Sequence, residues 1–182
     1  MKKQLRLFLA IDGIYAVAFG LLGPIYAIYV QGIGGDILDA GIAWSIFMII
    51  SGLGIMVSGK IQNTSTKLSR ILMYGYLIRA AAFAGYIFVS TTLHLFLVQA
   101  VLGFALIINA PATYSFYTKH VEKGKFASQW SAWESVWYIA QGCAAIIGAV
   151  IAKYLGFATL FGAMAILSLI SALMALKLQD DE

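Results

Sequence analysis

Charge, cysteine and histidine are scarce in this sequence, and each shortage excludes a class of protein. Only 11% of the 182 residues are charged and 62% are hydrophobic, which is too apolar for a water-soluble domain of this length. The single cysteine, Cys143, excludes an intrachain disulfide and a thiolate metal cluster within one chain. The two histidines, His94 and His120, lie near expected helix ends. We therefore expect neither a metal site nor a cofactor.

Motifs of enzyme chemistry are also missing. The sequence contains no nucleophile elbow, P-loop, zinc-binding HExxH or dinucleotide-binding glycine pattern. It offers no convincing Ser/His or Asp/Asp pair for an intramembrane hydrolase, so we expect no catalytic residues and no enzyme. The formal net charge of +4 does not indicate nucleic acid, because the basic residues lie in short loops and not along one stripe.

Long apolar runs dominate the chain instead. The first extends from Leu7 to Val30, beyond the roughly 20 residues that a membrane-spanning helix needs and too long for the core of a signal peptide. The other expected spans are residues 40–58, 71–89, 95–117, 127–152 and 157–176. They are about twice the length of a barrel strand. We predict an all-α polytopic membrane protein in which residues 1–182 form a single domain of six transmembrane helices.

The basic residues predict the orientation of these spans. Ten of the 12 lysines and arginines fall on one side of the expected membrane: Lys2, Lys3, Arg6, Lys60, Lys67, Arg70, Lys119, Lys123, Lys125 and Lys177. The opposite side has only Lys153. By the positive-inside rule both termini are cytoplasmic, in a cell (inner or plasma) membrane, and any dimer is parallel.

The two halves of the chain resemble each other. The segment Leu7–Leu9 recurs as Leu95–Leu97, and the pattern of proline and tyrosines in 24–29 recurs in 111–117. Ser45 and Gly52 also recur as Ser135 and Gly142, so the offsets are 87 to 90 residues throughout. Chance is the alternative, because membrane helices share few residue types. A repeat of three helices, about 1–92 and 93–182, inserts its second copy upside down. Such inverted repeats are typical of secondary transporters, which bind substrates near the bilayer midplane.

Several segments resemble the major facilitator superfamily. They are residues 23–26, the stretch 122–128, Gly142, Gly148, Ala152 and the stretch 153–161. The family's signature loop between its second and third helices is only partly present. Gly59 and Lys67 fit that loop, whereas Asn63 replaces its acid. The resemblance makes Gly59, Asn63 and Lys67 gating-loop candidates and puts gating by charge pairs in doubt.

The resemblance covers only the amino-terminal half of a typical family member. Members of the family carry two six-helix bundles around a central cavity, and this chain has one. A lone bundle exposes the polar face that normally meets its partner. The resemblance therefore implies a half-transporter that pairs with a second copy about a twofold axis along the membrane normal. A separate partner chain and a truncated chain are the alternatives.

Three charged residues lie inside the expected spans, and each is a candidate for proton coupling or for an ion pair. At about 1.5 Å per residue, Asp12, Arg79 and Glu134 lie at similar depths from the cytoplasmic side. A charge at membrane depth is costly and typically faces a cavity or a partner. The alternative is a structural ion pair, which the resemblance favours for Arg79 because it places the third helix outside the bundle.

Aromatic and polar residues of the first, fourth and fifth spans are candidates for a substrate cavity. Trp130, Trp133 and Trp137 share one helical face, which fits either an interfacial aromatic belt or a cavity wall for an apolar or cationic solute. The full set of cavity candidates is Tyr15, Tyr26, Gln99, Asn109, Tyr114, Trp133, Trp137 and Gln141. Gly142 and Gly148 are expected to allow close helix packing.

These features together predict a secondary active transporter. The expected protein is half-size, works as a parallel homodimer and moves a small solute, an apolar or cationic drug-like compound, by proton-coupled alternating access. Its expected partners are the solute, the proton and the lipid bilayer. The alternative is a membrane scaffold or partner subunit that retains the fold without transporting anything.

Overall fold

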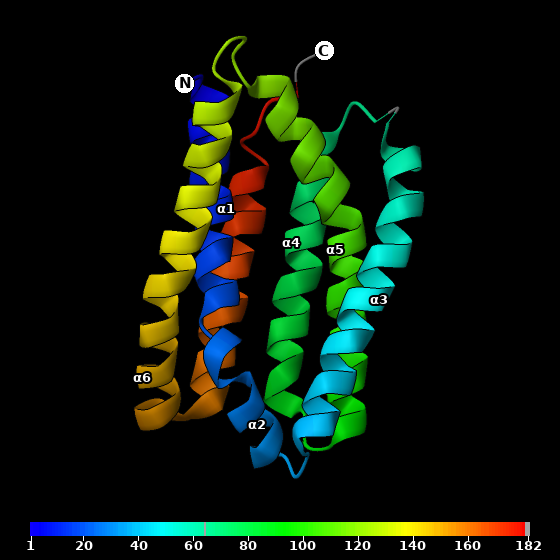
Figure 1. Cartoon of the computed structure of the whole chain (residues 1–182), viewed down its shortest axis with the longest axis vertical. Coiled ribbons are helices and arrows are strands. Elements are labelled where there is room, and N and C mark those ends of the chain that lie inside the picture. Colours follow the sequence, from blue (N-terminus) through cyan, green and yellow to red (C-terminus); the bar gives the residue numbers. More distant parts are fainter. Residues whose placement is uncertain (64, 181–182) are drawn as a thin grey trace.

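The computed structural model describes residues 1–63 and 65–180, and this part of the chain is all helical (Figure 1). The elements are α1 (Lys3–Gly20), η1 (Gly23–Ile25), α2 (Tyr26–Gly32), α3 (Ile37–Gln62), α4 (Leu68–Gly85), η2 (Tyr86–Phe88), α5 (Thr92–His120) and α6 (Phe126–Ala175). Within the described residues, five helical segments are long and apolar enough to cross a membrane. The predicted all-α class is confirmed.

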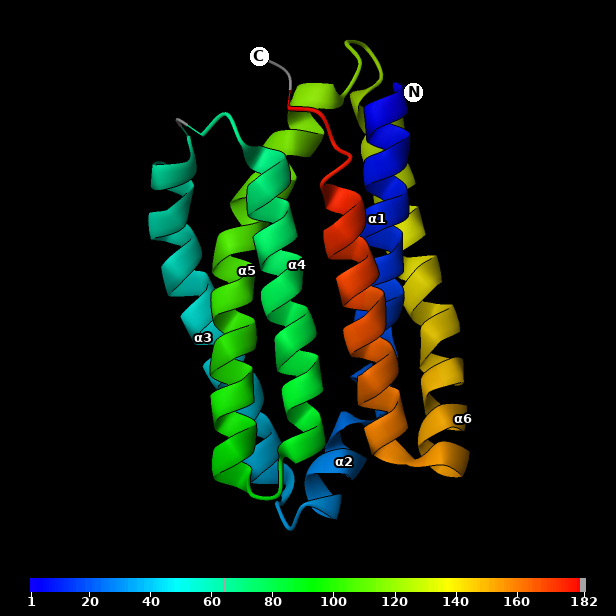
Figure 2. The ribbon, with the colours of Figure 1, turned by 180° about the vertical axis from the view of Figure 1, so that it is seen from behind.

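The longest element, α6, reverses direction at Gly156. This residue has φ 83° and ψ 165°, a conformation that costs glycine little because it has no Cβ. The first arm, 126–155, runs away from the termini and the second, 157–175, returns beside it (Figures 1 and 2). The sequence predicted a turn between the fifth and sixth spans, at residues 153–156. In the structure the chain reverses at the last of these residues, and only Gly156 has a non-helical conformation.

The first apolar run is not the single helix that we predicted. Helix α1 ends at Gly20, and the 3-10 turn η1 separates it from the short helix α2. Pro24 explains the break, because it lacks an N–H and its ring clashes with the carbonyl group one turn earlier. Helix α2 lies across the end of the bundle (Figure 1). Helices α3 and α5 extend a few residues beyond their predicted bounds, whereas α4 begins three residues earlier and ends four residues earlier than predicted.

The start of α1 and the end of the second arm of α6 lie at one end of the bundle, together with the starts of α4 and of α6 (Figure 1). The opposite end holds α2 and the reversal of α6. Most of the basic residues thus gather at the end that carries the termini, as their distribution in the sequence predicted.

Contacts between neighbouring helices hold the bundle together. Helix α1 packs against α6, α3 packs against α5, and α4 packs against both α5 and α6. Near α2, the ring of Phe161 lies 4.8 Å from the rings of both Tyr29 and Tyr86. The hydroxyl of Tyr29 also donates to the carbonyl oxygen of Tyr86 at 3.2 Å. These contacts fix the cross-lying α2 against the second arm of α6.

Pro111 interrupts the hydrogen bonding of α5, and α3 compensates for it. A proline inside a helix leaves the carbonyl group four residues earlier without its helical partner, here that of Ile107. The hydroxyl of Ser58 donates to this carbonyl oxygen at 2.7 Å, and the amide of Gln62 donates to the carbonyl oxygen of Ile108 at 3.0 Å. Freed backbone groups in lipid need such partners, so the proline also anchors α3.

Candidate functional site

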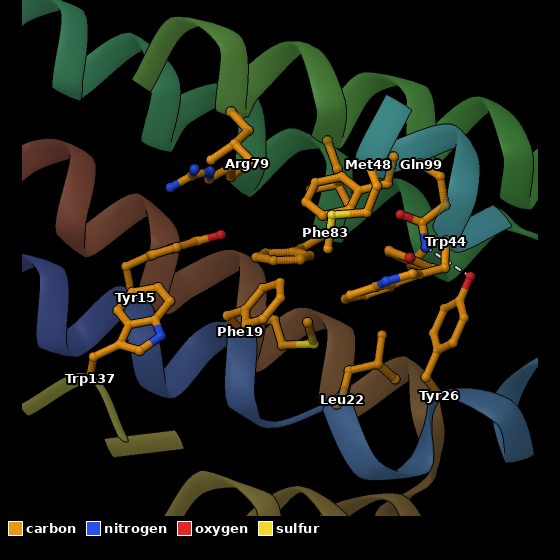
Figure 3. Close-up of a pocket in the computed structure, with 16 residues that line it drawn as sticks. Tyr15, Phe19, Leu22, Tyr26, Trp44, Met48, Arg79, Phe83, Gln99 and Trp137 are labelled. Atoms are coloured by element: carbon orange, nitrogen blue, oxygen red, sulfur yellow. Dashed lines mark hydrogen bonds between the residues drawn. The ribbon is translucent and has the colours of Figure 1, made fainter. Parts of the chain in front are cut away.

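Two cavities lie side by side within the bundle. The first, which we call the aromatic cavity, has a volume of about 490 Å³, and Trp44 and Phe83 are among the residues of its wall (Figure 3). The second, which we call the acidic cavity, has a volume of about 290 Å³ and is lined by Asp12 and Glu134 among others. Both cavities are lined by Tyr15, Arg79, Leu106 and Trp137. These four residues therefore form a shared wall.

Asp12 is buried in the wall of the acidic cavity and binds two other helices. Its side chain is only 4% exposed. The hydroxyl of Tyr76, on α4, donates to one carboxylate oxygen at 2.9 Å, and Nε1 of Trp133, on α6, donates to the other at 2.6 Å. Trp133 is fixed in turn by the rings of Phe8, 5.6 Å away, and Tyr117, 4.6 Å away. Asp12 therefore links α1, α4 and the first arm of α6.

These two partners suit a carboxyl group that changes its protonation state. The indole N–H of Trp133 can only donate, so the oxygen that it contacts remains an acceptor. The hydroxyl of Tyr76 can donate to an ionised Asp12 or accept from a protonated one. Asp12 can thus hold or release a proton without losing either contact. The sequence analysis missed Tyr76, although it lies one helical turn before Arg79 on the same face of α4.

Arg79 lies in the wall between the cavities and is 4% exposed. Its guanidinium carbon is 4.2 Å from the ring centre of Tyr15 and 5.7 Å from that of Tyr76. Among the described residues, no carboxylate oxygen lies within 4.0 Å of its nitrogens. The direct Asp12–Arg79 ion pair that we considered as a structural alternative is therefore absent from this arrangement.

Glu134 lines the acidic cavity at its exposed side. Its side chain is exposed, and two neighbours in the cavity wall are also open, Tyr114 at 55% and Tyr138 at 67% exposure. Trp137 faces both cavities, whereas Trp133 is 8% exposed and is bonded to Asp12. Trp133 and Trp137 thus line cavity walls, whereas Trp130 of the same helical face is not among the lining residues of either cavity.

The far end of the aromatic cavity is polar. There the amide of Gln99 donates to the hydroxyl of Tyr26 at 2.8 Å, and the ring of Trp44 lies 6.4 Å from that of Tyr26 (Figure 3). Trp44 was not among the predicted cavity residues. Phe47 and Met48, three and four positions later on α3, line the same cavity, so this helical spacing is a signal that could have identified Trp44.

Asn109 and Gln141, two other predicted cavity residues, are placed differently. Asn109 lines the acidic cavity, but its amide donates to the carbonyl oxygen of Leu72 at 3.1 Å and its oxygen accepts from Thr113 at 2.9 Å. The first bond joins α5 to α4, and the second, within α5, fixes the orientation of the Asn109 side chain. Gln141 lines neither cavity, and its backbone packs against Gly20 of α1.

Comparison with known families identifies the family to which this architecture belongs. Residues 9–182 match the sequence profile described as Major Facilitator Superfamily. The chain belongs to the major facilitator superfamily. A search of curated proteins found no match. Members of this superfamily are transporters and not enzymes, which places the chain among multi-pass membrane proteins that move a solute.

The three gating-loop candidates lie at the end of α3 and in the connection to α4. Gly59 lies within α3, Asn63 follows its end, and Lys67 precedes α4. None of these three forms an ion pair with a described residue. Instead, Asp180 accepts hydrogen bonds from the backbone N–H of Ser69 at 2.9 Å and from its hydroxyl at 2.7 Å. A carboxylate near the start of α4 thus comes from the end of the chain and not from the loop.

A second acid, Glu122, lies at the same end of the bundle and forms ion pairs there. Glu122 pairs with Lys125 at 2.7 Å, and this contact, together with the terminal amino group 2.9 Å away, lowers the pKa of Glu122 to about 2. A lowered pKa contributes stability above the ordinary value and loses it as pH falls through about 2. Glu122 therefore stays ionised at neutral pH, and pH dependence near neutrality must come from other groups.

Proposed function

We propose that this chain is a half-size secondary transporter that moves a small solute by proton-coupled alternating access. The supporting observation is the juxtaposition of a buried carboxyl group, Asp12, and a cavity of about 490 Å³ across a shared wall. That volume lies within the range of about 300–1,000 Å³ for small-molecule sites. The solute and the proton would then occupy neighbouring compartments.

The lining of the aromatic cavity favours a solute with an apolar body. Its wall contains the rings of Phe19, Trp44, Phe83 and Trp137, and the pair Tyr26 and Gln99 supplies hydrogen-bonding groups at one end (Figure 3). Small-molecule sites are mostly apolar with a few polar groups that fix orientation. The expectation of an apolar, drug-like solute therefore remains part of the proposal.

Asp12 and Glu134 are the proposed proton carriers. Asp12 is buried and can be satisfied in either protonation state, whereas Glu134 lies at the exposed side of the same cavity. In this scheme Glu134 exchanges protons with the outside of the bundle, and Asp12 holds the proton beside the solute. Acids inside membrane segments commonly mark such relays.

The proposed assembly is a parallel homodimer of six-helix bundles. Each bundle consists of two inverted repeats of three helices, with the two arms of α6 as its fifth and sixth crossings. A charge facing lipid at mid-membrane depth costs about 3 kcal/mol, so the exposed side of Glu134 needs a partner. A second copy would shield Glu134 from lipid and place the acidic cavity at the interface between the two bundles. Both termini would be cytoplasmic, in a cell membrane.

A non-transporting membrane scaffold is the second candidate. It is favoured by the absence of an acid at Asn63, because a gating loop without its charge pair fits a protein that no longer alternates. The hydrogen bonds from Ser69 to Asp180 argue against this alternative. They form a contact at the same end of the bundle that could break and re-form during alternation, in place of the missing charge pair.

Flux measurements in proteoliposomes separate the two candidates. Purified protein would be reconstituted with a pH-sensitive dye inside and exposed to a broad panel of anionic, neutral and cationic aromatic solutes. We expect solute-dependent proton movement that responds to an imposed pH gradient and is missing from liposomes without protein. If no solute on the panel produces flux, the scaffold interpretation replaces the transporter.

Crosslinking in native membranes tests the homodimer. In a Cys143→Ser background, Tyr138→Cys places a thiol beside the mouth of the acidic cavity, and Ile166→Cys places one on the second arm of α6; both positions are exposed, at 67% and 60%. We expect a crosslinked dimer with Tyr138→Cys and none with the matched control Ile166→Cys. A monomer in both cases, and in mild detergent, would refute the dimer.

A further inference from the structure

Among the described residues, Arg79 carries the only formal charge in the wall of the aromatic cavity. The other residues of that wall are aromatic, aliphatic or neutral polar side chains. Figure 3 shows Arg79 with Tyr15 and Trp137 at one end of the cavity and Tyr26 with Gln99 at the other. The cavity is therefore asymmetric, with a cationic end, an apolar middle and a neutral polar end.

The guanidinium of Arg79 lacks the partners that a buried cation requires. It is 4% exposed, and within the described part of the chain it makes no hydrogen bond and no ion pair at 4.0 Å or less. Its contacts are the ring faces of Tyr15 and Tyr76. A guanidinium carries several N–H donors in a fork that matches a carboxylate. The nitrogens of Arg79 are not among the fully buried unpaired atoms of the described residues, so they open onto cavity space that an acceptor could occupy.

Asp12 does not fill this role. Both of its carboxylate oxygens already accept hydrogen bonds, one from Tyr76 and one from Trp133. Asp12 lines the acidic cavity only, whereas Arg79 also faces the aromatic cavity. Figure 3 shows the guanidinium at the end of the aromatic cavity beside Tyr15, with its nitrogen atoms on the side away from Phe83 and Trp44. The described residues of the aromatic wall include no acid, so an acid that pairs with Arg79 from this cavity would have to belong to a bound molecule.

We infer that the aromatic cavity binds an organic anion whose carboxylate or similar acidic group pairs with Arg79 and whose aromatic body fills the space toward Trp44. This inference rests on the proposed transport function and names its substrate class. It also replaces the cationic solute considered from the sequence, because a cation among these tryptophans would be repelled by Arg79 in a medium of low dielectric constant. Tyr26 and Gln99 would contact the far end of the anion.

Binding of matched aromatic probes tests the charge preference directly. The probes are 2-naphthoate, 2-naphthylmethanol and 2-naphthylmethylammonium, which share one ring system and differ in charge. Binding to the full chain in nanodiscs would be followed by quenching of tryptophan fluorescence, since Trp44 and Trp137 line the cavity. We expect 2-naphthoate to bind at least about tenfold more tightly than the other two, because a charge-assisted hydrogen bond is lost with them.

Arginine variants show whether this preference arises at the proposed site. We expect Arg79→Gln to abolish the preference and Arg79→Lys to keep part of it, while Arg70→Gln, the same change at an exposed position of α4, leaves it intact. Thermal unfolding of Arg79→Lys would verify that the variant folds. Equal binding of the three probes to the wild type, a preference for the cation, or a preference that survives Arg79→Gln would overturn the inference.

Measuring both probe binding and solute flux distinguishes the proposed anion site from the proposed transport function. Anion binding that depends on Arg79 without any solute flux in proteoliposomes would support the site and refute transport. Flux of neutral or cationic solutes that is unaffected by Arg79→Gln would support transport and refute the anion site.

Discussion

Replacing Asp12 with asparagine is expected to abolish proton-coupled transport while leaving the protein folded. An asparagine side chain can keep both contacts, because its oxygen accepts from Trp133 and its amide group can donate to the hydroxyl of Tyr76. What it cannot do is gain or lose a proton. Solute-driven proton movement into dye-loaded proteoliposomes should therefore fall to the level of protein-free vesicles, with thermal unfolding close to wild type.

Two companion variants make this result specific. Tyr76→Phe removes one hydrogen bond to Asp12 but keeps the acid, so coupling should be weakened and not lost. Glu134→Gln should also abolish coupling if the exposed acid relays the proton to Asp12. Wild-type coupling in Asp12→Asn would reduce Asp12 to a structural link between helices, and wild-type coupling in Glu134→Gln would remove Glu134 from the relay.

The sequence was sufficient to predict the all-helical membrane fold and its family, because both depend on long apolar runs and local motifs. It was also sufficient to identify Asp12, Arg79 and Glu134, since charged residues inside apolar spans stand out. The structure adds that all three line one cavity. Their proposed roles in proton coupling remain predictions.

Contacts between distant segments could not be predicted from the sequence. The bond from Trp133 to Asp12 joins residues 121 positions apart, and nothing local to either residue indicates the other. The same holds for Ser58, whose partner at Ile107 is defined by Pro111 on another helix. The break at Pro24 was predictable in principle, because proline cannot continue a helix. The hydropathy of the sequence did not indicate the break, since the apolar run continues through η1 into α2.

The different surroundings of two glycines of α6 also could not be predicted from the sequence. Gly142 and Gly148 lie on the same arm of α6, and we expected both to allow close packing. The structure separates them: a Cβ at Gly142 would meet nothing within 4 Å, whereas a Cβ at Gly148 would overlap the backbone carbonyl of Leu21. Only Gly148 therefore lies at a close crossing of α1 and α6. Gly142 has open space on an exposed part of the arm.

Gly148→Ala is consequently expected to destabilise the bundle strongly. The added methyl group would meet backbone atoms of Leu21 that cannot rotate away, so α1 must move from α6, and overpacking of this kind costs about 1–3 kcal/mol or more. This shift would also strain the bond between Asp12 and Trp133, which spans the same two helices. Thermal unfolding in detergent would measure the loss, with Gly142→Ala as the matched control that should unfold like wild type. Equal stability of the two variants would show that α1 and α6 are not in the close contact described here.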